Sequence, residues 1–231
     1  MRIVSLVPSA TETLAAWGVE PIAVTRFCER PDLLAVGGTK NPDIAAIAAL
    51  EPDLVVMNVE ENRKVDAEAL REAGCNVHVI AIDRVDDVMS QMDHLARAVR
   101  LEALPTPLAG WSAPPVPPTA IRAFVPIWRT PWMTMSADTY GASILRTVGI
   151  EALTLPTGDR YPTVTLDAIA ALAPEVVLAP SEPYAFAERH RPELEMIAPM
   201  HFVDGKDIFW WGVRTPTAVE RLREIAQTLR R

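Results

Sequence analysis

The chain has 231 residues, of which 49% are hydrophobic, and its mean hydropathy is +0.12. These values suit a globular protein of one large or two small domains and exclude a disordered chain. The formal net charge of −8 disfavours nucleic acid and anionic membrane surfaces as partners, because phosphate groups attract basic surfaces. No apolar run reaches the roughly 18–20 residues needed to cross a bilayer, so we expect no membrane span.

The first residues lead directly into an apolar run, without the basic, apolar and small-residue regions of a secretory signal. We therefore expect a cytoplasmic protein, or a periplasmic or extracellular one if a leader precedes Met1 in the natural protein. Cys28 and Cys75 are too few for a disulfide framework. Both are expected as reduced thiols.

The first predicted elements are a strand over residues 3–7 and a helix that begins at Ser9. Ser9 and Glu12 have the spacing of a capping box, in which Ser9 caps the helix and Glu12 returns to the Ser9 amide. Gly18 provides the helix stop. In open α/β sheets ligands bind beyond the carboxyl ends of the strands, so this turn is a candidate ligand contact.

Short, β-branched apolar runs recur along both halves of the chain, separated by helical stretches. This pattern predicts parallel sheets that are covered by helices on both faces. The predicted strands are 3–7, 22–25, 54–57 and 77–82 in the first half, and 123–127, 176–178 and 201–203 in the second.

An internal repeat relates the two halves. The segment "DIAAIAALEPDLVVMNVE" at 43–60 returns as "TLDAIAALAPEVVLAPSE" at 165–182, with a constant offset of 122 residues. A weaker similarity links "SATETLAAWGVE" with "SADTYGASILRTVGIE". The repeat predicts two copies of one α/β unit.

Between the halves, residues 85–100 have apolar side chains at helical spacing and contain no Gly or Pro. One long helix is therefore expected to join two lobes. The following residues up to 118 are rich in proline and predict an extended connection. The expected domains are an N-terminal lobe over 1–84, a linker over 85–118 and a C-terminal lobe over 119–231.

The loops after the predicted strands contain most of the aromatic residues of the second half. Trp128, Trp132, Trp210 and Trp211 lie in two of these loops, and an aromatic wall of this kind suits a ligand cleft. Adjacent residues of an extended segment point in opposite directions, so Trp210 and Trp211 cannot both enter one core. At least one of them is expected to be exposed or to face a ligand.

Motifs of common enzyme classes are missing, including the phosphate-binding loop, the G-x-S-x-G elbow, H-E-x-x-H and C-x-x-C. The histidines show no i, i+4 spacing, so we expect no metal site. Glu60 and Glu182 end equivalent strands and leave open an alternative, an enzyme that uses them as acid and base. We expect a binding protein without catalytic residues or a catalytic cofactor.

Five segments carry a resemblance that covers nearly the whole chain: "RIVSLVPSATETLAAWG", "VGGTKNPDIAAIAALEPDLVVMNVEENRK", "VPIWRTPWMTMSADTYG", "RYPTVTLDAIAALAPEVVLAPSEPY" and "FWWGVRTPTAVERL". In their order they resemble the helical-backbone (class III, TroA-like) substrate-binding proteins of ABC importers for cobalamin, siderophores, haem and metals. The similarity is strongest to the cobalamin-binding branch and its "helical backbone metal receptor" relatives.

The resemblance implies a two-lobed α/β protein, each lobe a parallel sheet flanked by helices, with a corrinoid or related metal chelate between the lobes. The implied function is transport or intracellular handling of that ligand. Ferric siderophore, haem or a metal ion are alternative ligands, and a scaffold for a protein partner is a further alternative. A monomer is expected, with an ABC permease as a possible partner that docks at Glu61 and Glu182. The implied ligand-binding residues are Pro8, Ser9, Lys40, Asn41, Asn58, Glu60, Trp128, Trp132, Tyr161, Tyr184, Trp210 and Trp211. Arg129, a charged residue of the same loop as Trp128, is a further candidate for ligand contact.

Overall fold

The computed structural model describes residues 1–231, which form two compact units. Unit 1 consists of Met1–Ile82, Asp86–Trp111 and Trp211–Arg214. Unit 2 consists of Asp83–Val85, Ser112–Trp210 and Thr215–Arg231. Residues 86–111, which we expected to form part of a separate linker, thus belong to unit 1.

Unit 1 is built on a five-stranded sheet of order β3-β2-β1-β6-β7, in which every neighbouring pair is parallel. Its strands are β1 (Ile3–Ser5), β2 (Ala23–Val24), β3 (Leu34–Ala35), β6 (Leu54–Asn58) and β7 (Val77–Ile80). A short antiparallel pair, β4 (Gly37–Gly38) and β5 (Asn41–Pro42), lies outside this sheet.

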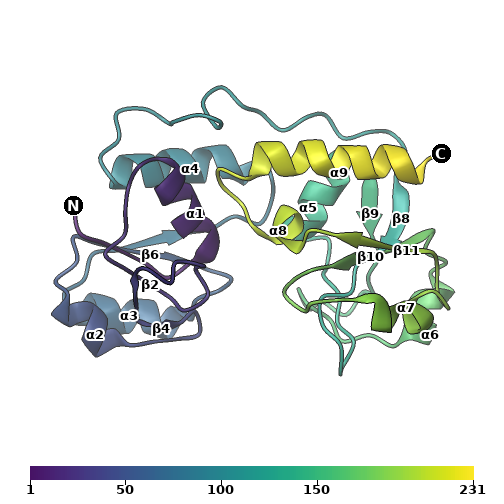
Figure 1. Ribbon diagram of the computed structural model, residues 1–231, viewed down its shortest axis with the longest axis horizontal. Coiled ribbons are helices and arrows are strands. Elements are labelled where there is room, and N and C mark those ends of the chain that lie inside the picture. The colour runs from purple at the N-terminus through teal and green to yellow at the C-terminus, as the bar shows by residue number, and fades with distance from the viewer. The chain divides into compact units, whose positions relative to one another are not determined.

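Helices cover both faces of the unit 1 sheet: α1 and α4 lie on one side, and α2 and α3 on the other (Figure 1). Their bounds are Pro8–Ala16 for α1, Ile44–Ala49 for α2, Lys64–Glu72 for α3 and Asp87–Ala98 for α4. The predicted helix over 85–100 is thus present as α4. Its apolar stripe is buried, as the periodicity indicated, and includes Val88, Met92 and Leu95.

Unit 2 has a four-stranded, all-parallel sheet of order β11-β10-β8-β9. Its strands are β8 (Ile121–Phe124), β9 (Ile150–Ala152), β10 (Val176–Pro180) and β11 (Met200–Val203). Its helices are α5 (Tyr140–Thr147), α6 (Leu166–Ala171), α7 (Arg191–Leu194), α8 (Gly205–Phe209), α9 (Thr215–Leu229) and the 3₁₀ turn Glu188–His190. None of the chain's helices has the length and apolar character needed to span a membrane.

The repeat is confirmed residue by residue. Helix α2 and strand β6 of unit 1 correspond to α6 and β10 of unit 2, and both pairs of bounds keep the offset of 122. The N-cap residues also correspond: Asp43 accepts a hydrogen bond from the N–H of Ala46, and Thr165 accepts one from Ala168. These equivalent caps start equivalent helices because each satisfies an otherwise unpaired backbone donor.

The predicted start of the first helix is wrong. Helix α1 begins at Pro8, its N-cap is Val7, and no side chain caps it. Proline suits this first position because its missing N–H has no helical partner there. Ser9 therefore lies inside the helix, and the expected capping box with Glu12 does not form. Gly18, with φ of +72°, follows the helix end as predicted.

Both cysteines are free and buried. Burial raises the pKa of the Cys28 thiol, and hydrogen bonds from Thr11 and Thr25 only partly oppose this shift. Burial likewise raises the pKa of Cys75. Both groups are therefore protonated at neutral pH.

Candidate ligand-binding loops

The loop after β8 carries Trp128, Arg129 and Trp132, which were predicted to bind ligand. Two main-chain hydrogen bonds close this loop: Ile127 N donates to Met133 O at 2.9 Å, and Met133 N donates to Trp128 O at 3.1 Å. The Trp128 side chain is 44% exposed.

Aromatic rings from this loop meet rings from the loop after β10. Trp128 contacts Tyr184 edge-on at 5.6 Å between ring centroids. Trp132 stacks on Phe186 at 6.0 Å with planes 8° apart, and Tyr184 lies 4.8 Å from Phe186. We call the rings of Trp128, Trp132, Tyr184, Phe186 and His190 the aromatic platform. It follows the carboxyl ends of two adjacent parallel strands, where α/β proteins bind ligands.

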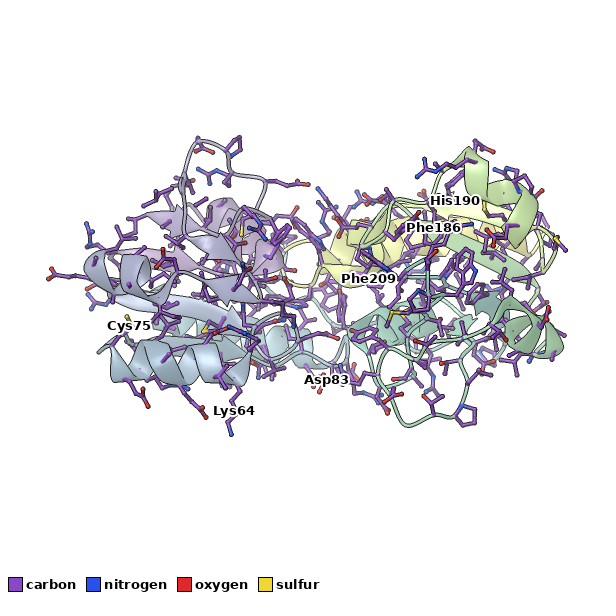
Figure 2. The ribbon with its side chains drawn as sticks, turned by 90° about the horizontal axis from the view of Figure 1, so that it is seen from below. Lys64, Cys75, Asp83, Phe186, His190 and Phe209 are labelled. Carbon is purple, nitrogen blue, oxygen red and sulfur yellow. The ribbon has the colours of Figure 1, made fainter.

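His190 is buried next to Phe186, with 5.4 Å between the ring centroids (Figure 2). Its Nδ1 accepts a hydrogen bond of 3.0 Å from Ala187 N, and its Nε2 is 3.3 Å from the Tyr184 hydroxyl. Burial lowers the pKa of His190, and the positive charges of Arg189 and Arg129 lower it further. The ring is therefore neutral at physiological pH.

Arg129 is held by two contacts within unit 2. Its guanidinium lies over the Trp132 ring at 5.6 Å from the centroid, and it forms an ion pair of 3.0 Å with Glu193. Arg129 is half-buried. It therefore places a positive charge at the edge of the platform.

Two further predicted residues of unit 2 lie outside the platform. Tyr161 is half-buried and follows Arg160, which pairs with Asp83 at 2.8 Å. Trp210 is half-buried at the end of α8, where Lys206 Nζ lies 4.8 Å from its ring centroid.

The tryptophan pair at 210 and 211 is divided between the units, and only Trp210 is partly exposed, as expected for adjacent side chains that point in opposite directions. Trp211 belongs to unit 1 and is only 2% exposed. The prediction that Trp211 contacts ligand is therefore not supported by its position, because its indole is covered. Trp210 retains an accessible face.

In unit 1 the β4–β5 hairpin presents Lys40 and Asn41, both exposed. Lys40 Nζ donates a 2.6 Å hydrogen bond to the carbonyl of Glu60. This hydrogen bond brings the hairpin and the turn after β6 together. The closing Gly37–Gly38 strand leaves no space for a Cβ at either position.

The turn after β6 is organised by two buried asparagines. Asn58 Oδ1 accepts a 2.7 Å hydrogen bond from Glu61 N, and Asn58 N donates to Asn62 Oδ1 at 2.8 Å. The Asn62 amide group donates to the carbonyls of Leu6 and Thr39. The predicted ligand residue Asn58 thus shapes the turn that presents Glu60 and Glu61, both half-buried.

Pro8 and Ser9 are buried in the first turn of α1. Their side chains lie in the interior, so the ligand contact predicted for them is not supported by their position. Glu182, at the corresponding turn of unit 2, is half-buried and follows β10. Its backbone and side chain pack closely on Gly205, where a Cβ would have no space.

Some residues of these loops were not predicted to bind ligand. Phe186 and His190 complete the platform, but single aromatic residues in a loop cannot be told from core residues by sequence alone. Phe27 follows β2, is 51% exposed, and lies under the Arg26 guanidinium at 5.0 Å. The sequence "TRFCE" placed both residues after a strand, which is the only signal that could have found them.

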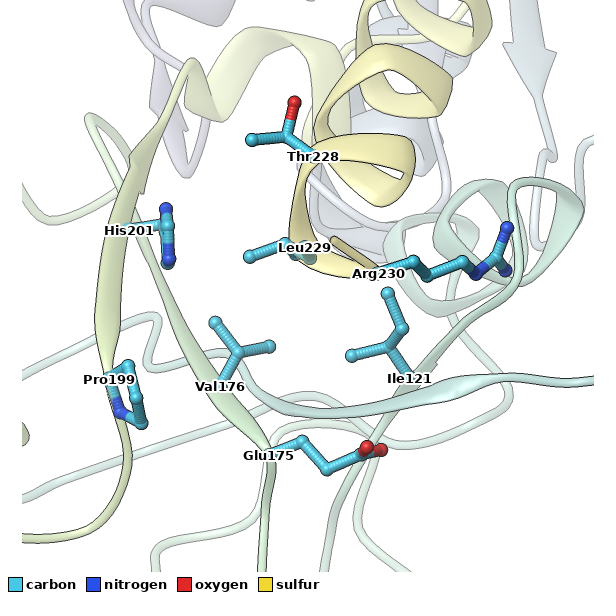
Figure 3. Close-up of a pocket in the computed structure, with 8 residues that line it drawn as sticks. All are labelled: Ile121, Glu175, Val176, Pro199, His201, Thr228, Leu229 and Arg230. Atoms are coloured by element: carbon cyan, nitrogen blue, oxygen red, sulfur yellow. The ribbon is translucent and has the colours of Figure 1, made fainter.

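A cavity of about 500 Å³ lies elsewhere in unit 2 (Figure 3). Ile121 begins β8, and Glu175 and Pro199 immediately precede β10 and β11, so this cavity is at the amino ends of the strands. Its other lining residues are Val176, His201, Thr228, Leu229 and Arg230. The cavity and the platform therefore lie at opposite ends of the strands of the unit 2 sheet.

No group of three or more His, Cys, Asp or Glu side chains is arranged to hold a metal ion. No protein-family model matches the chain.

Comparison with known proteins gives a consistent set of relatives. The chain is 24% identical over 195 residues to the vitamin B12-binding protein of Vibrio parahaemolyticus, covering 76% of this chain and 69% of that protein. The crystal structure of the periplasmic vitamin B12-binding protein BtuF of Vibrio cholerae has a TM-score of 0.82 at 18% identity, covering 100% and 98% of the two chains.

The periplasmic haem-binding protein BhuT, in complex with two haems, has a TM-score of 0.81 at 20% identity, covering 99% and 98% of the chains. These relatives are binding proteins rather than enzymes. The chain therefore has the α/β fold of the class III periplasmic binding proteins, which confirms the resemblance in its sequence.

Proposed function

We propose that this protein is a substrate-binding protein that captures a corrinoid, with the aromatic platform of unit 2 as its principal contact surface. The observation that carries the proposal is the exposed Trp128 ring on a cluster of mutually supporting rings. A flat, largely apolar macrocycle gains most from such a surface, because stacking and burial of apolar area act together.

The likeness to vitamin B12-binding proteins in both sequence and structure supports the corrinoid. Haem is the second candidate, because a haem-binding structure matches the fold almost as well. Arg129, at the platform edge, supports either ligand: corrinoids carry a phosphate and haem carries carboxylates, and a guanidinium pairs with both groups.

Calorimetric titration with cyanocobalamin, haemin and ferrichrome tests the function. We expect saturable one-site binding of cyanocobalamin without turnover of the bound ligand. Trp128→Ala should weaken this binding by about tenfold or more, which corresponds to about 1.4 kcal/mol. Trp111→Ala is the matched control, because Trp111 is half-buried in unit 1 and lies in none of the candidate loops.

Tighter binding of haemin than of cyanocobalamin would mean that the ligand is haem and not a corrinoid. Absence of binding for all three compounds would refute the proposal, as would product formation from any of them. Equal losses in Trp128→Ala and Trp111→Ala would place the ligand away from the platform.

We further propose that the protein delivers its ligand to an ABC permease through Glu61 and Glu182. A secreted version of the chain can be tested in a corrinoid-dependent strain that lacks its own binding protein but keeps its permease. Growth should be restored, and Glu61→Lys with Glu182→Lys should abolish it while calorimetric binding is retained. Unchanged growth of the double variant would exclude these acids as docking residues.

A further inference from the structure

His190 is the most buried side chain of the aromatic platform, with 4% of its surface exposed, yet both of its ring nitrogens have partners. The ring contacts Tyr184 edge-on at 5.5 Å and Phe186 at 5.4 Å. Through these two neighbours it supports the rings of Trp128 and Trp132. His190 thus contacts both Tyr184, which packs on Trp128, and Phe186, which stacks on Trp132.

The partner of Nδ1 defines the tautomer of this histidine. A backbone N–H can only donate, so Nδ1 must accept the hydrogen bond from Ala187 and carries no proton. The proton of the neutral ring is therefore on Nε2, which donates to the Tyr184 hydroxyl oxygen at 3.3 Å. Because its oxygen is the acceptor in this contact, the Tyr184 hydroxyl keeps its own proton for donation to another group.

We infer that His190 is a positioning residue: its Nε2–H holds Tyr184 so that the phenolic O–H donates to a carbonyl, carboxylate or phosphate oxygen on the rim of the bound macrocycle. This inference rests on the proposed capture of a tetrapyrrole-type ligand, and it adds a class of ligand group that the platform recognises. Stacking on tryptophan alone would accept any flat ligand. A directed hydroxyl donor selects ligands that have an acceptor at the ring edge.

Protonation of His190 reverses the arrangement. A second proton would sit on Nδ1 and face the N–H of Ala187, so two donors would meet and the loop would have to move. The charged groups that act on this ring are Arg189 and Arg129, which disfavour the imidazolium, and Glu193, which favours it. Burial is the main cause of the lowered pKa of His190 and the two arginines add to it, so the neutral, positioning form persists below the usual histidine pKa.

Cyanocobalamin and haemin affinities, measured by calorimetry between about pH 5.5 and about pH 7.5, test the inference. Tyr184→Phe and His190→Phe should each weaken binding by about five- to tenfold at the higher pH. In the double variant the loss should equal that of Tyr184→Phe alone, because His190 acts through Tyr184. Additive losses would overturn the inference.

His190→Gln provides the second arm, because its amide nitrogen can donate to Tyr184 but cannot titrate. It should retain most of the affinity at the higher pH and should not show the acid-induced weakening that we expect for the wild-type protein. The matched control is His201→Gln, a substitution of an exposed histidine of unit 2 outside the platform. An unchanged acid weakening in His190→Gln would overturn the positioning role, and this result stands even if His190→Phe does not fold.

A ligand-free measurement separates this inference from the proposed function. If the wild-type protein binds neither compound, the proposed function is wrong. The near-ultraviolet circular dichroism of the platform should still change on acidification in the wild-type protein and not in His190→Gln. The same spectral change in both proteins would show that His190 does not hold the platform.

Discussion

The backbone N–H of Val213 donates a 3.2 Å hydrogen bond to the side-chain oxygen of Thr13, although 200 positions separate the two residues. The Thr13 hydroxyl in turn donates to the carbonyl of Ser9 at 2.8 Å. Between these contacts Gly212 has φ of +96°, and a Cβ there would collide with Thr13 Oγ1. The segment Trp211–Arg214 thus lies against α1 and becomes part of unit 1.

Gly212→Ala is expected to lower the free energy of unfolding by about 2–4 kcal/mol, because a positive φ and a steric collision act together. Gly74→Ala is the control: Gly74 has φ of +83° but nothing within 4 Å of a new Cβ. It should lose only about 1–2 kcal/mol. Urea unfolding measures both, and equal losses would show that the contact with Thr13 is unimportant.

Asn62→Ala should destabilise the protein by about 2–4 kcal/mol, because it removes partners from the backbone groups of Asn58, Leu6 and Thr39 in a buried turn. Asn76→Ala tests the alternative that the loss of any hydrogen bond between an asparagine side chain and the backbone destabilises the protein by this amount. Asn76 is exposed and makes a single 3.3 Å bond to Asp53 O, so its loss should stay below about 1 kcal/mol. Chemical denaturation measures the unfolding free energy of both variants. A loss in Asn62→Ala no larger than that in Asn76→Ala would contradict the structural role of Asn62.

The stability of the protein should fall on acidification through His78. Burial lowers the pKa of His78, and the nearby His94 lowers it further. The unfolded chain, with an ordinary histidine pKa of about 6.5, therefore binds a proton before the folded chain does. The stability associated with neutral His78 is fully present above a pH of about 6.5. It is lost as the pH falls towards the lowered pKa of His78 in the folded chain.

Unfolding free energies of the wild-type protein and His78→Gln, measured across this range, check the prediction. The stability difference between the two should move in favour of His78→Gln below about pH 6.5. His201→Gln, a substitution of an exposed histidine, is the control. Parallel curves for wild type and His78→Gln would contradict the assignment.

Arg129→Gln should separate stability from ligand binding. Its ion pair with Glu193 is 40% and 36% exposed, so its loss should change stability by less than about 1 kcal/mol. If the guanidinium reaches a ligand anion, cyanocobalamin affinity should fall by about three- to tenfold in calorimetry. Glu193→Gln breaks the same pair but keeps the Arg129 charge, so it should retain affinity. Equal loss in both variants would mean that the ion pair, and not the charge on Arg129, matters.

Sequence periodicity predicted much of the fold because its signals are local. The offset of 122 between α2–β6 and α6–β10 follows from repeated caps and apolar runs, and each can be read within one element. Strands β3 and β9 were not predicted because neither lies in a run of β-branched apolar residues, which was the signal that marked the other strands. The α1 start was misplaced because a serine after a proline fits both a cap and a first helical turn.

The candidate site was only partly readable from the sequence. Trp128 and Tyr184 were predicted as ligand residues and do meet, since both follow strands that pair in the sheet. His190 was missed because no spacing reveals that a 3₁₀ turn will place its ring against Tyr184. Phe186 was missed because a single aromatic residue in a loop has no spacing that distinguishes it from a core residue. Trp211 was predicted beside Trp210, but the chain passes from one unit to the other between them.

The amino-acid sequence by itself determined the duplicated α/β units, the helix α4 and the loops that follow the strands, because caps, turns and apolar periodicity act over a few neighbouring residues. Only the tertiary structure decided which side chains in those loops meet. The contacts of Trp128 with Tyr184, and of Val213 with Thr13, depend on distances between segments that are packed by the core, and such packing leaves no periodic trace in either segment.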